Sequence, residues 1–267
     1  MIDIERVSGI INTTGGKNML QNERHERILS KLKIHNTVKV ADLAQELGIS
    51  ESTIRRDITE LDHAGKLKKV FGGAVAVNGD ITYGETNVTQ RTMINVEEKE
   101  LIARYAATMV QENDFVYIDA GTTTEKMIDY LDKKNVTYIT NGITHAKKLI
   151  QKGFDAYIIG GLLRPSTEAV IGTTAIEAVQ HYNFTKCFMG TNGVDIERGF
   201  TTPDIGEAAI KTAVMKKAYM SFVLADHTKF GLISPVTFAE LDEACIITDK
   251  LMNEHLRQYT VIKEVEE

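Results

Sequence analysis

Residues 23 to 64 carry three successive runs in which apolar positions recur every three or four residues. The first two runs predict short amphipathic helices on either side of a brief extended piece at Val38. Their apolar positions are Ile28, Leu29 and Leu32, followed by Val40, Leu43, Ala44 and Leu47. A tight turn is predicted next, because Gly48 can adopt a positive φ and Ser50 can cap the helix that follows.

The third run predicts a helix from Glu51 to about Ala64. Its inward face is apolar, with Ile54, Ile58 and Leu61 spaced four and then three residues apart. Its outward face carries hydroxyl and basic side chains: Ser52, Thr53, Arg55, Arg56 and Thr59. Arginine pairs with guanine edges or phosphates, and hydroxyls near a helix N-terminus bond phosphates, so this face is interpreted as a DNA-reading surface. The alternative is an ordinary solvated helix face.

A basic stretch follows the third helix, which Gly65 is expected to end. Residues 66 to 73 alternate well enough to predict a two-stranded wing, whose lysines would lie against the DNA backbone. Three short helices, a glycine turn and a basic wing occur within about fifty-five residues. Together they predict a winged helix-turn-helix.

From Glu97 onward, helical and extended patterns alternate. Helices are predicted at 97–110 and 125–131, and strands at 115–119, 137–140, 157–159, 187–189, 221–225 and 244–248. This order is typical of an α/β domain with a mostly parallel sheet covered by helices.

Polar residues and glycines follow the predicted strands, at the sheet edge where such folds bind ligands. The segment from Asp119 to Thr124 precedes a helix, so its glycine, hydroxyls and free amides can cradle a phosphate. Residues at this and later strand ends form the candidate pocket: Asp119, Gly121, Thr122, Thr123, Asn141, Gly160, Gly161, Arg164, Gly190 and Gly193.

Two further charged pairs are candidates for the same pocket. Glu207 and Lys211 lie four residues apart on a predicted helix, and Asp226 and Lys229 follow a strand. Exposed surface ion pairs are the alternative for both.

Charge and composition separate the two parts. Residues 19 to 73 hold ten Lys and Arg against eight Asp and Glu, whereas residues 74 to 267 hold nineteen against twenty-seven. DNA binding must therefore be confined to a local basic face.

The two cysteines, Cys187 and Cys245, lie in apolar runs and are expected to be buried, with no metal or cofactor. No apolar run is long enough to cross a bilayer, so a cytoplasmic protein is expected.

The length of 267 residues favours two domains. Residues 1–18 lack periodicity and are expected to form a disordered tail. The DNA-binding domain is placed at 19–76, a linker at 77–95 and the α/β domain at 96–267.

Several motifs resemble the DeoR family of sugar-operon repressors. The most specific is Thr53-Ile54-Arg55-Arg56-Asp57, accompanied by Phe71-Gly72-Gly73-Ala74 and, in the sensor, by Asp119 to Thr123 and Asp226 to Gly231. Glu85 and Arg91 match residues that the family carries in its connector. The resemblance implies a sensor similar in fold to ribose-5-phosphate isomerase and glucosamine-6-phosphate deaminase. Residues expected to contact DNA are Ser50, Ser52, Thr53, Arg55, Arg56, Lys68 and Lys69.

The resemblance implies a repressor of a carbohydrate operon whose operator affinity responds to a phosphorylated sugar, with fructose 1-phosphate as the first compound to test. Two or more chains, as a dimer or tetramer, are expected to bind repeated half-sites. The main alternative is an isomerase-like or deaminase-like enzyme, in which Asp119 or Glu207 would be the general base and Lys211 or Lys229 an electrophilic partner. A dinucleotide-binding module fits poorly, because residues 119–124 lack the required glycine spacing.

Overall fold

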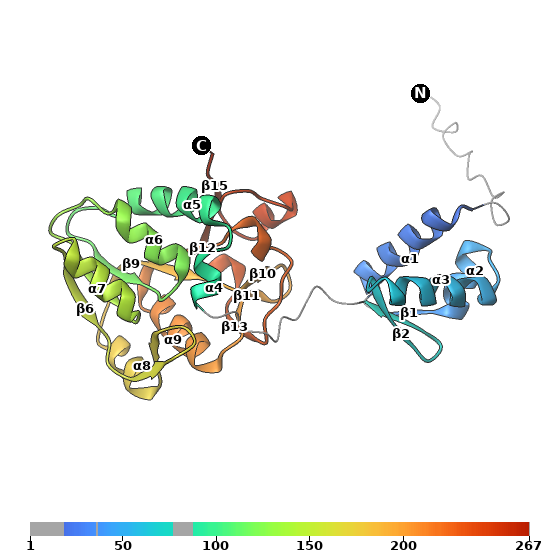
Figure 1. Ribbon diagram of the computed structural model, residues 1–267, viewed down its shortest axis with the longest axis horizontal. Coiled ribbons are helices and arrows are strands. Elements are labelled where there is room, and N and C mark those ends of the chain that lie inside the picture. The colour runs from blue at the N-terminus through green and yellow to red at the C-terminus, as the bar shows by residue number, and fades with distance from the viewer. Residues whose placement is uncertain (1–18, 36, 77–87, 267) are drawn as a thin grey trace, which may run out of the picture. The chain divides into compact units, whose positions relative to one another are not determined.

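The computed structural model describes residues 19–35, 37–76 and 88–266 (Figure 1). The chain divides between Asn78 and Gly79 into two compact units. The tail expected at residues 1–18, and residues 77–87 of the expected linker, lie outside the described residues.

The smaller unit is built from three helices and a three-stranded antiparallel sheet. The helices are α1 (Gln21–His35), α2 (Val40–Leu47) and α3 (Glu51–His63). The strands β1 (Thr37–Lys39), β2 (Leu67–Val70) and β3 (Gly73–Ala76) pair in the order β1-β3-β2. Their apolar faces enclose one core that includes Ile28, Leu43 and Ile58. These elements confirm the predicted winged helix-turn-helix.

Local chemistry fixes the turn between α2 and α3. Gly48 adopts φ 65°, and the Ser50 hydroxyl accepts a hydrogen bond of 3.3 Å from the Thr53 amide. The wing reaches further than the sequence pattern indicated. Its second strand starts at Gly73 and continues to Ala76, so Phe71 and Gly72 form the connecting turn.

The larger unit contains a seven-stranded sheet whose neighbouring strands are all parallel. Its order is β15-β14-β12-β9-β4-β5-β6. The strands are β4 (Phe115–Ile118), β5 (Thr137–Thr140), β6 (Asp155–Ile158), β9 (Phe184–Gly190), β12 (Ala218–Leu224), β14 (Cys245–Thr248) and β15 (Ile262–Glu264). The predicted mostly parallel α/β domain is thereby confirmed.

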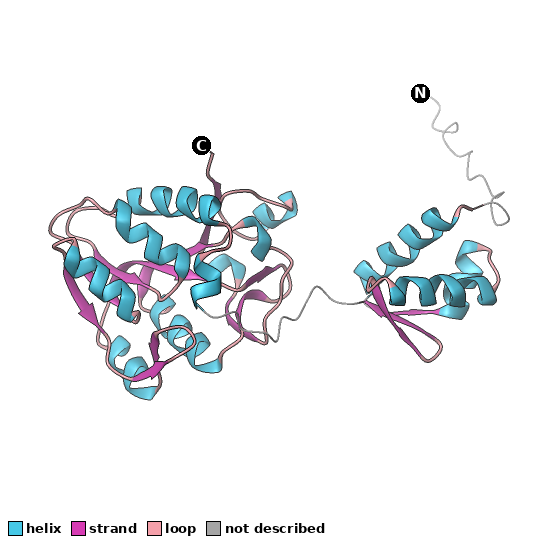
Figure 2. Ribbon diagram, viewed as in Figure 1, coloured by secondary structure: helices cyan, strands magenta, loops and turns pink. Residues whose placement is uncertain are grey.

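Helices cover both faces of this sheet (Figures 1 and 2). One core packs against α5 (Val96–Thr108), α6 (Thr122–Tyr130) and α7 (Ile143–Gln151). The other packs against α8 (Thr173–Gln180) and α9 (Ile205–Met215). The helix predicted to begin at Glu125 starts three residues earlier, so Thr122, Thr123 and Thr124 form its first turn.

Two small sheets complete the unit. The strands β7 (Leu162–Arg164) and β8 (Ala169–Ile171) form a hairpin. The strands β10 (Gly193–Asp195), β11 (Gly199–Thr202) and β13 (Val236–Ala239) form an antiparallel sheet. A short helix, α4 (Val88–Thr92), precedes α5 and contacts α6, although the sequence pattern placed it in the linker. Single 3₁₀ turns lie at His227–Lys229, Leu241–Glu243 and Glu254–Gln258.

The strand order reverses direction between β4 and β9. From β4 the chain moves through β5 to β6, and from β9 it moves through β12 and β14 to β15. At such a switch point, the loops beyond the carboxyl ends of the two strands diverge and leave a crevice. At the opposite, amino-terminal end, the buried Lys186 ammonium on β9 pairs with the buried Asp114 carboxylate just before β4.

Across the described residues, every helix is too short or too polar to serve as a membrane span. Cys187 is buried and Cys245 is partly buried, and both are free thiols. Burial raises the pKa of the Cys187 thiol to about 12, which keeps it protonated and unreactive at neutral pH.

Candidate functional site

The outward face of α3 presents the two predicted arginines to solvent. Their side chains are 56% and 80% exposed for Arg55 and Arg56 respectively. Each pairs with an acid one helical turn away: Arg55 with Glu51 at 2.7 Å and Arg56 with Glu60 at 3.2 Å. These exposed pairs contribute little to stability, so the guanidinium groups are available to exchange a carboxylate for a phosphate.

The hydroxyl groups at the start of α3 form a cluster. The Ser50 hydroxyl lies 2.9 Å from those of Ser52 and Thr53 while capping the helix. Ser50 therefore acts first as a helix cap, and Ser52 is an exposed residue of the cluster that does not cap the helix.

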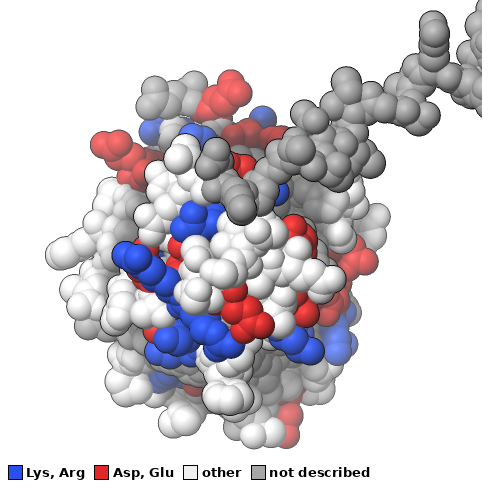
Figure 3. All heavy atoms as spheres, turned by 90° about the vertical axis from the view of Figure 1, so that its right-hand side faces the viewer, with Lys and Arg blue, Asp and Glu red and all other residues white. Residues whose placement is uncertain are grey.

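The wing is tied to α3 through its lysines. The Lys69 ammonium donates to the Thr59 hydroxyl at 2.9 Å, and the Lys69 amide donates to Asp62 at 3.0 Å. The Lys68 side chain is 73% exposed. Figure 3 shows Lys and Arg side chains gathered in a band on the face that it views, with Asp and Glu beside them. Such a band agrees with the local basic face that DNA binding requires.

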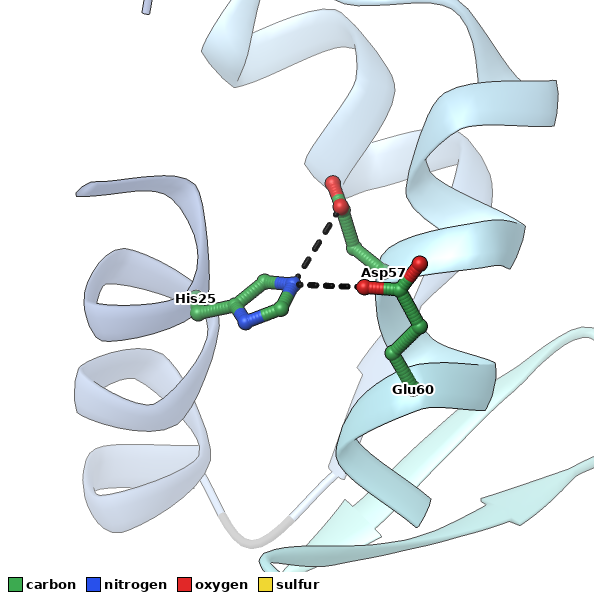
Figure 4. A group of neighbouring side chains, drawn as sticks. All are labelled: His25, Asp57 and Glu60. Carbon is green, nitrogen blue, oxygen red and sulfur yellow. Dashed lines mark hydrogen bonds and ion pairs between the residues drawn. The ribbon is translucent and has the colours of Figure 1, made fainter. Parts of the chain in front are cut away.

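A polar cluster joins α1 to α3 within the smaller unit (Figure 4). The buried Asp57 carboxylate accepts hydrogen bonds of 2.7 and 2.9 Å from the Arg24 guanidinium. The His25 ring lies 3.3 Å from the same carboxylate and 3.9 Å from Glu60. Because Arg24 already neutralises Asp57, the cluster positions α3 against α1 and is poorly suited to a metal ion. Asp57 thus orients an arginine of α1, Arg24.

The main pocket of the larger unit lies at the switch point between β4 and β9. It encloses about 710 Å³ of space, a volume that includes open solvent at its mouth. Nine of the predicted residues line it: Asp119, Gly121, Thr122, Thr123, Gly190, Glu207, Lys211, Asp226 and Lys229.

A buried ion pair forms the floor of this pocket. The Lys211 ammonium donates to the Asp119 carboxylate, and to the Gly190 carbonyl at 3.0 Å. The Gly190 amide donates to the same carboxylate at 3.1 Å. Lys211 thus pairs with Asp119 across the switch point, and the exposed Glu207–Lys211 pair considered from the sequence is not formed.

Five predicted residues lie outside the pocket lining. Asn141 supports it indirectly, because its side-chain oxygen accepts a 2.9 Å hydrogen bond from the Ala120 amide. Arg164 pairs with Asp204 and lies 4.0 Å from Glu207. The remaining three are glycines: Gly160 and Gly161 follow β6, and Gly193 is the first residue of β10.

Two of these glycines are required by close packing. A Cβ atom on Gly161 would lie 2.6 Å from the Ile171 carbonyl oxygen, and one on Gly193 would lie 2.2 Å from that of Leu232. Gly160 has open space around it and follows β6, the edge strand, two strands away from β4.

The sequence analysis assigned no pocket role to several lining residues. They are Arg91, Ile94, Lys99, Ala120, Thr191, Asn192 and Leu224. Arg91 matches the family connector, which was the one available signal for it. Lys99 is buried on α5, and its ammonium donates to the Arg91 carbonyl and to the Ile94 carbonyl at 2.7 Å. Burial lowers the pKa of Lys99 to about 8, although nearby Asp226 opposes the shift.

Two buried side-chain atoms in the pocket lack a hydrogen-bond partner among the described residues: Glu207 Oε1 and Arg91 Nε. Leaving such atoms unpaired is costly, so both positions favour a bound polar molecule.

Comparisons with known proteins give the same division of the chain. The model of the DeoR-like helix-turn-helix domain matches residues 24–79, and that of the DeoR C terminal sensor domain matches residues 94–250. The chain belongs to the DeoR family. As a DeoR-family protein, it is a DNA-binding transcriptional regulator with a C-terminal sensor domain.

Among its relatives is FruR of Bacillus subtilis (strain 168), an HTH-type transcriptional regulator. The two are 42% identical over 251 residues, which cover 92% of this chain and 99% of FruR. The lactose phosphotransferase system repressor of Staphylococcus aureus (strain MRSA252) is 31% identical over 226 residues, covering 82% of this chain and 89% of that protein.

Among solved structures, ribose 5-phosphate isomerase A from Neisseria gonorrhoeae is 15% identical. The match covers 49% of this chain and 52% of the isomerase, with a TM-score of 0.37. This similarity is too low to indicate a shared activity.

Proposed function

We propose that this DeoR-family regulator represses a carbohydrate-utilisation operon and that a phosphorylated sugar in the switch-point pocket changes its operator affinity. The observation that carries the proposal is the pocket itself. Its lining combines a helix N-terminus and several cations with a buried carboxylate oxygen, Glu207 Oε1, that has no hydrogen-bond partner among the described residues. The phosphate of such a sugar can bind the helix N-terminus and the cations, and a sugar hydroxyl can donate a hydrogen bond to the carboxylate oxygen.

The anion end lies at the start of α6. The first backbone amides of a helix lack intrahelical acceptors, and Thr122 and Thr123, in the first turn of α6, line the pocket. Arg91, Lys99 and Lys229 line the same pocket and add positive charge. Phosphate is favoured where these groups meet.

The sugar end is defined by Glu207. Its carboxylate is buried, and Oε1 has no hydrogen-bond partner among the described residues. A hydroxyl of a bound sugar can donate to this oxygen and satisfy it. Asn192, which also lines the pocket, offers a further polar side chain.

The test is a thermal-shift screen of the purified full chain against sugar phosphates and their unphosphorylated parents. Fructose 1-phosphate is the first compound to test, followed by tagatose 6-phosphate. A selective ligand raises stability by mass action, by about 2.7 kcal/mol at a hundred times its Kd. Stabilisation by a phosphorylated sugar but not by its parent supports the proposal, and no response to any phosphate contradicts it.

Glu207→Gln probes the sugar end without changing its shape. We expect the variant to bind the sugar phosphate more weakly by about 1.5 to 3 kcal/mol, because a charge-assisted hydrogen bond is lost. Glu177→Gln is the control, since Glu177 is exposed on α8. Isothermal titration of both variants measures the difference, and equal affinities would exclude Glu207 from the site.

The pocket can also be considered as an enzyme site. Asp119, one candidate general base, already accepts hydrogen bonds from Lys211 and Gly190, which favours a structural role. Assays with ribose 5-phosphate and glucosamine 6-phosphate decide between the two functions. Turnover that Glu207→Gln abolishes would establish catalysis and overturn the sensor proposal.

A repressor of this kind needs repeated DNA contacts. Each chain has one recognition helix, α3, so we propose that dimers or tetramers bind repeated half-sites through residues 51–63. Sedimentation of the chain with and without operator duplex measures the number of chains bound, and binding as a single chain would contradict this part.

A further inference from the structure

Residues 88–95, here called the α4 segment, form the first described part of the larger unit, and residues 77–87 join them covalently to the winged helix-turn-helix. Hydrogen bonds join both ends of the segment to other parts of the larger unit. At its start, the Val88 amide donates to the Ser166 carbonyl at 3.2 Å. At its end, the Asn95 side chain donates to the Asp226 carboxylate at 3.0 Å and to the Thr228 hydroxyl at 3.1 Å.

Lys99 fastens the middle of the α4 segment. Its buried ammonium donates to two carbonyl groups of the segment, those of Arg91 and Ile94. The Arg91 carbonyl lies in the last turn of α4 and the Ile94 carbonyl just beyond it, where helix carbonyls lack internal donors and positive charge is favourable. Lys99 thus acts on the backbone of the segment, from a position in the pocket wall.

Arg91 connects the same segment to the interior of the pocket. Its side chain lines the main pocket and also a smaller hollow beside it, which Thr122, His145 and Thr167 line as well. Arg91 Nε is buried and has no hydrogen-bond partner among the described residues. A buried guanidinium nitrogen without an acceptor indicates that an acceptor is supplied by a ligand.

The charges around the α4 segment make its position sensitive to a bound anion. Arg91, Lys99 and Lys229 line one pocket, and both Arg91 and Lys229 oppose the positive charge on Lys99. Asp226 is the acid that favours that charge. An anion among these cations removes their mutual repulsion, so it stabilises the arrangement in which all three converge.

We propose that Arg91 is an effector-binding residue that transmits pocket occupancy to the linker, with Lys99 as the positioning residue that holds the α4 segment for this purpose. This inference rests on the proposed function. The effector binds more tightly when the α4 segment is docked, and by reciprocity effector binding favours the docked segment. Since the segment continues into residues 77–87, its docking constrains the chain that leads to α3.

The test measures coupling separately from affinity. The probe is fructose 1-phosphate, with inorganic phosphate as a second probe for the anion site. Titration calorimetry gives probe affinity. Fluorescence anisotropy gives the operator Kd with and without saturating probe, at fixed salt, on a duplex selected from random DNA by the wild-type protein. In the wild type, we expect the ratio of the two operator Kd values to be about 5 to 150.

Lys99→Met should retain operator binding in the absence of the probe and should bind the probe more weakly, while the ratio measured at saturating probe falls to within about twofold of 1. Methionine fills similar space without the ammonium that holds the segment. Arg91→Gln should lower probe affinity at least about tenfold, and should also lose coupling at saturation. Lys229→Gln is the matched control, because it removes a pocket cation outside the α4 segment. It should weaken the probe but keep the full ratio once the probe saturates.

The outcomes separate this inference from the proposed function. If neither these probes nor any other sugar phosphate of the thermal-shift screen binds the wild type, the proposed function fails and this inference fails with it. If the probe binds and Arg91→Gln and Lys99→Met retain the wild-type ratio, only the transmission role is overturned. Equal loss of coupling in Lys229→Gln would also overturn it, since coupling would then reflect general damage to the pocket.

Discussion

His145 shows how a single buried residue sets the acid sensitivity of the pocket. Its ring is buried beneath the loop after β4, with Nε2 3.1 Å from the Gly121 carbonyl oxygen and 3.2 Å from the Thr124 hydroxyl. Burial lowers the pKa of His145 to about 4, although Asp119 and the Gly121 carbonyl oppose the shift. The ring is therefore neutral in the folded protein at neutral pH.

This pKa predicts a loss of stability in mild acid. The folded protein binds the proton less well than the unfolded chain, whose histidine has a pKa of about 6.5. The stabilising contribution is therefore complete above pH 6.5 and is lost as the pH falls through 4. We expect the wild type to lose about 2 kcal/mol more between pH 7.5 and 5 than His145→Gln does. Urea unfolding at the two pH values measures this, and parallel losses would contradict it.

At the scale of the element, α3 combines a buried face with a reading face. Ile54, Ile58 and Leu61 are buried in the core, whereas Arg55 and Arg56 are exposed. This division allows DNA-contacting side chains to change without loss of folding. Each exposed ion pair on the helix is weak, so truncating its arginine leaves the fold intact.

Arg55→Ala and Arg56→Ala should therefore weaken operator binding by about 1 to 3 kcal/mol each. Lys68→Ala should mainly reduce the dependence of affinity on salt, by about one unit of slope, because a wing lysine contacts phosphate. Anisotropy titrations over a range of salt concentrations measure both effects. Arg104→Ala on α5 in the larger unit is a control that should change neither, and unchanged affinity in all the test variants would exclude this placement of helix and wing.

The elements themselves followed from the sequence because their patterns are local. The spacing of Ile54, Ile58 and Leu61 fixes α3, and Gly48 with Ser50 fixes its start. Apolar runs followed by polar residues likewise located β4, β5, β9, β12 and β14. The small strands β7, β8, β10, β11 and β13 were missed, because runs of three or four residues are too short to show a clear alternating pattern.

Pocket membership depended on strand order, which the residue pattern does not contain. Asp119 and Gly190 meet because β4 and β9 are neighbours, whereas Gly160 and Gly161 follow the edge strand β6. Lys99 was missed for a different reason. It reaches the pocket from the side, on a helix whose pattern indicates only an amphipathic surface.

At the scale of the whole molecule, the two units have separate hydrophobic cores. We therefore predict two transitions in calorimetric unfolding, each responding to its own ligand. A sugar phosphate should raise the transition of the larger unit, and operator DNA that of the smaller unit.

Core variants assign the two transitions. Ile58→Ala should reduce the free energy of unfolding of the smaller unit, and Ile246→Ala that of the larger unit. Each reduction should be about 2 to 5 kcal/mol, because both side chains are almost fully buried. A single transition that either variant lowers as a whole would show that the units unfold cooperatively, contrary to this prediction.

The two ends of the central strands differ in how well they tolerate substitution. At the amino-terminal end, the Lys186–Asp114 pair is buried and complete, and removing one partner would strand a charge in the interior. At the carboxyl end, the Asp119–Lys211 pair is likewise buried, but other lining residues, Thr122, Thr191 and Asn192, are only partly buried. In a duplicated gene, substitutions at these partly buried positions can therefore accumulate while the sheet stays folded. This separation lets one scaffold acquire regulators for new nutrients without first being rebuilt.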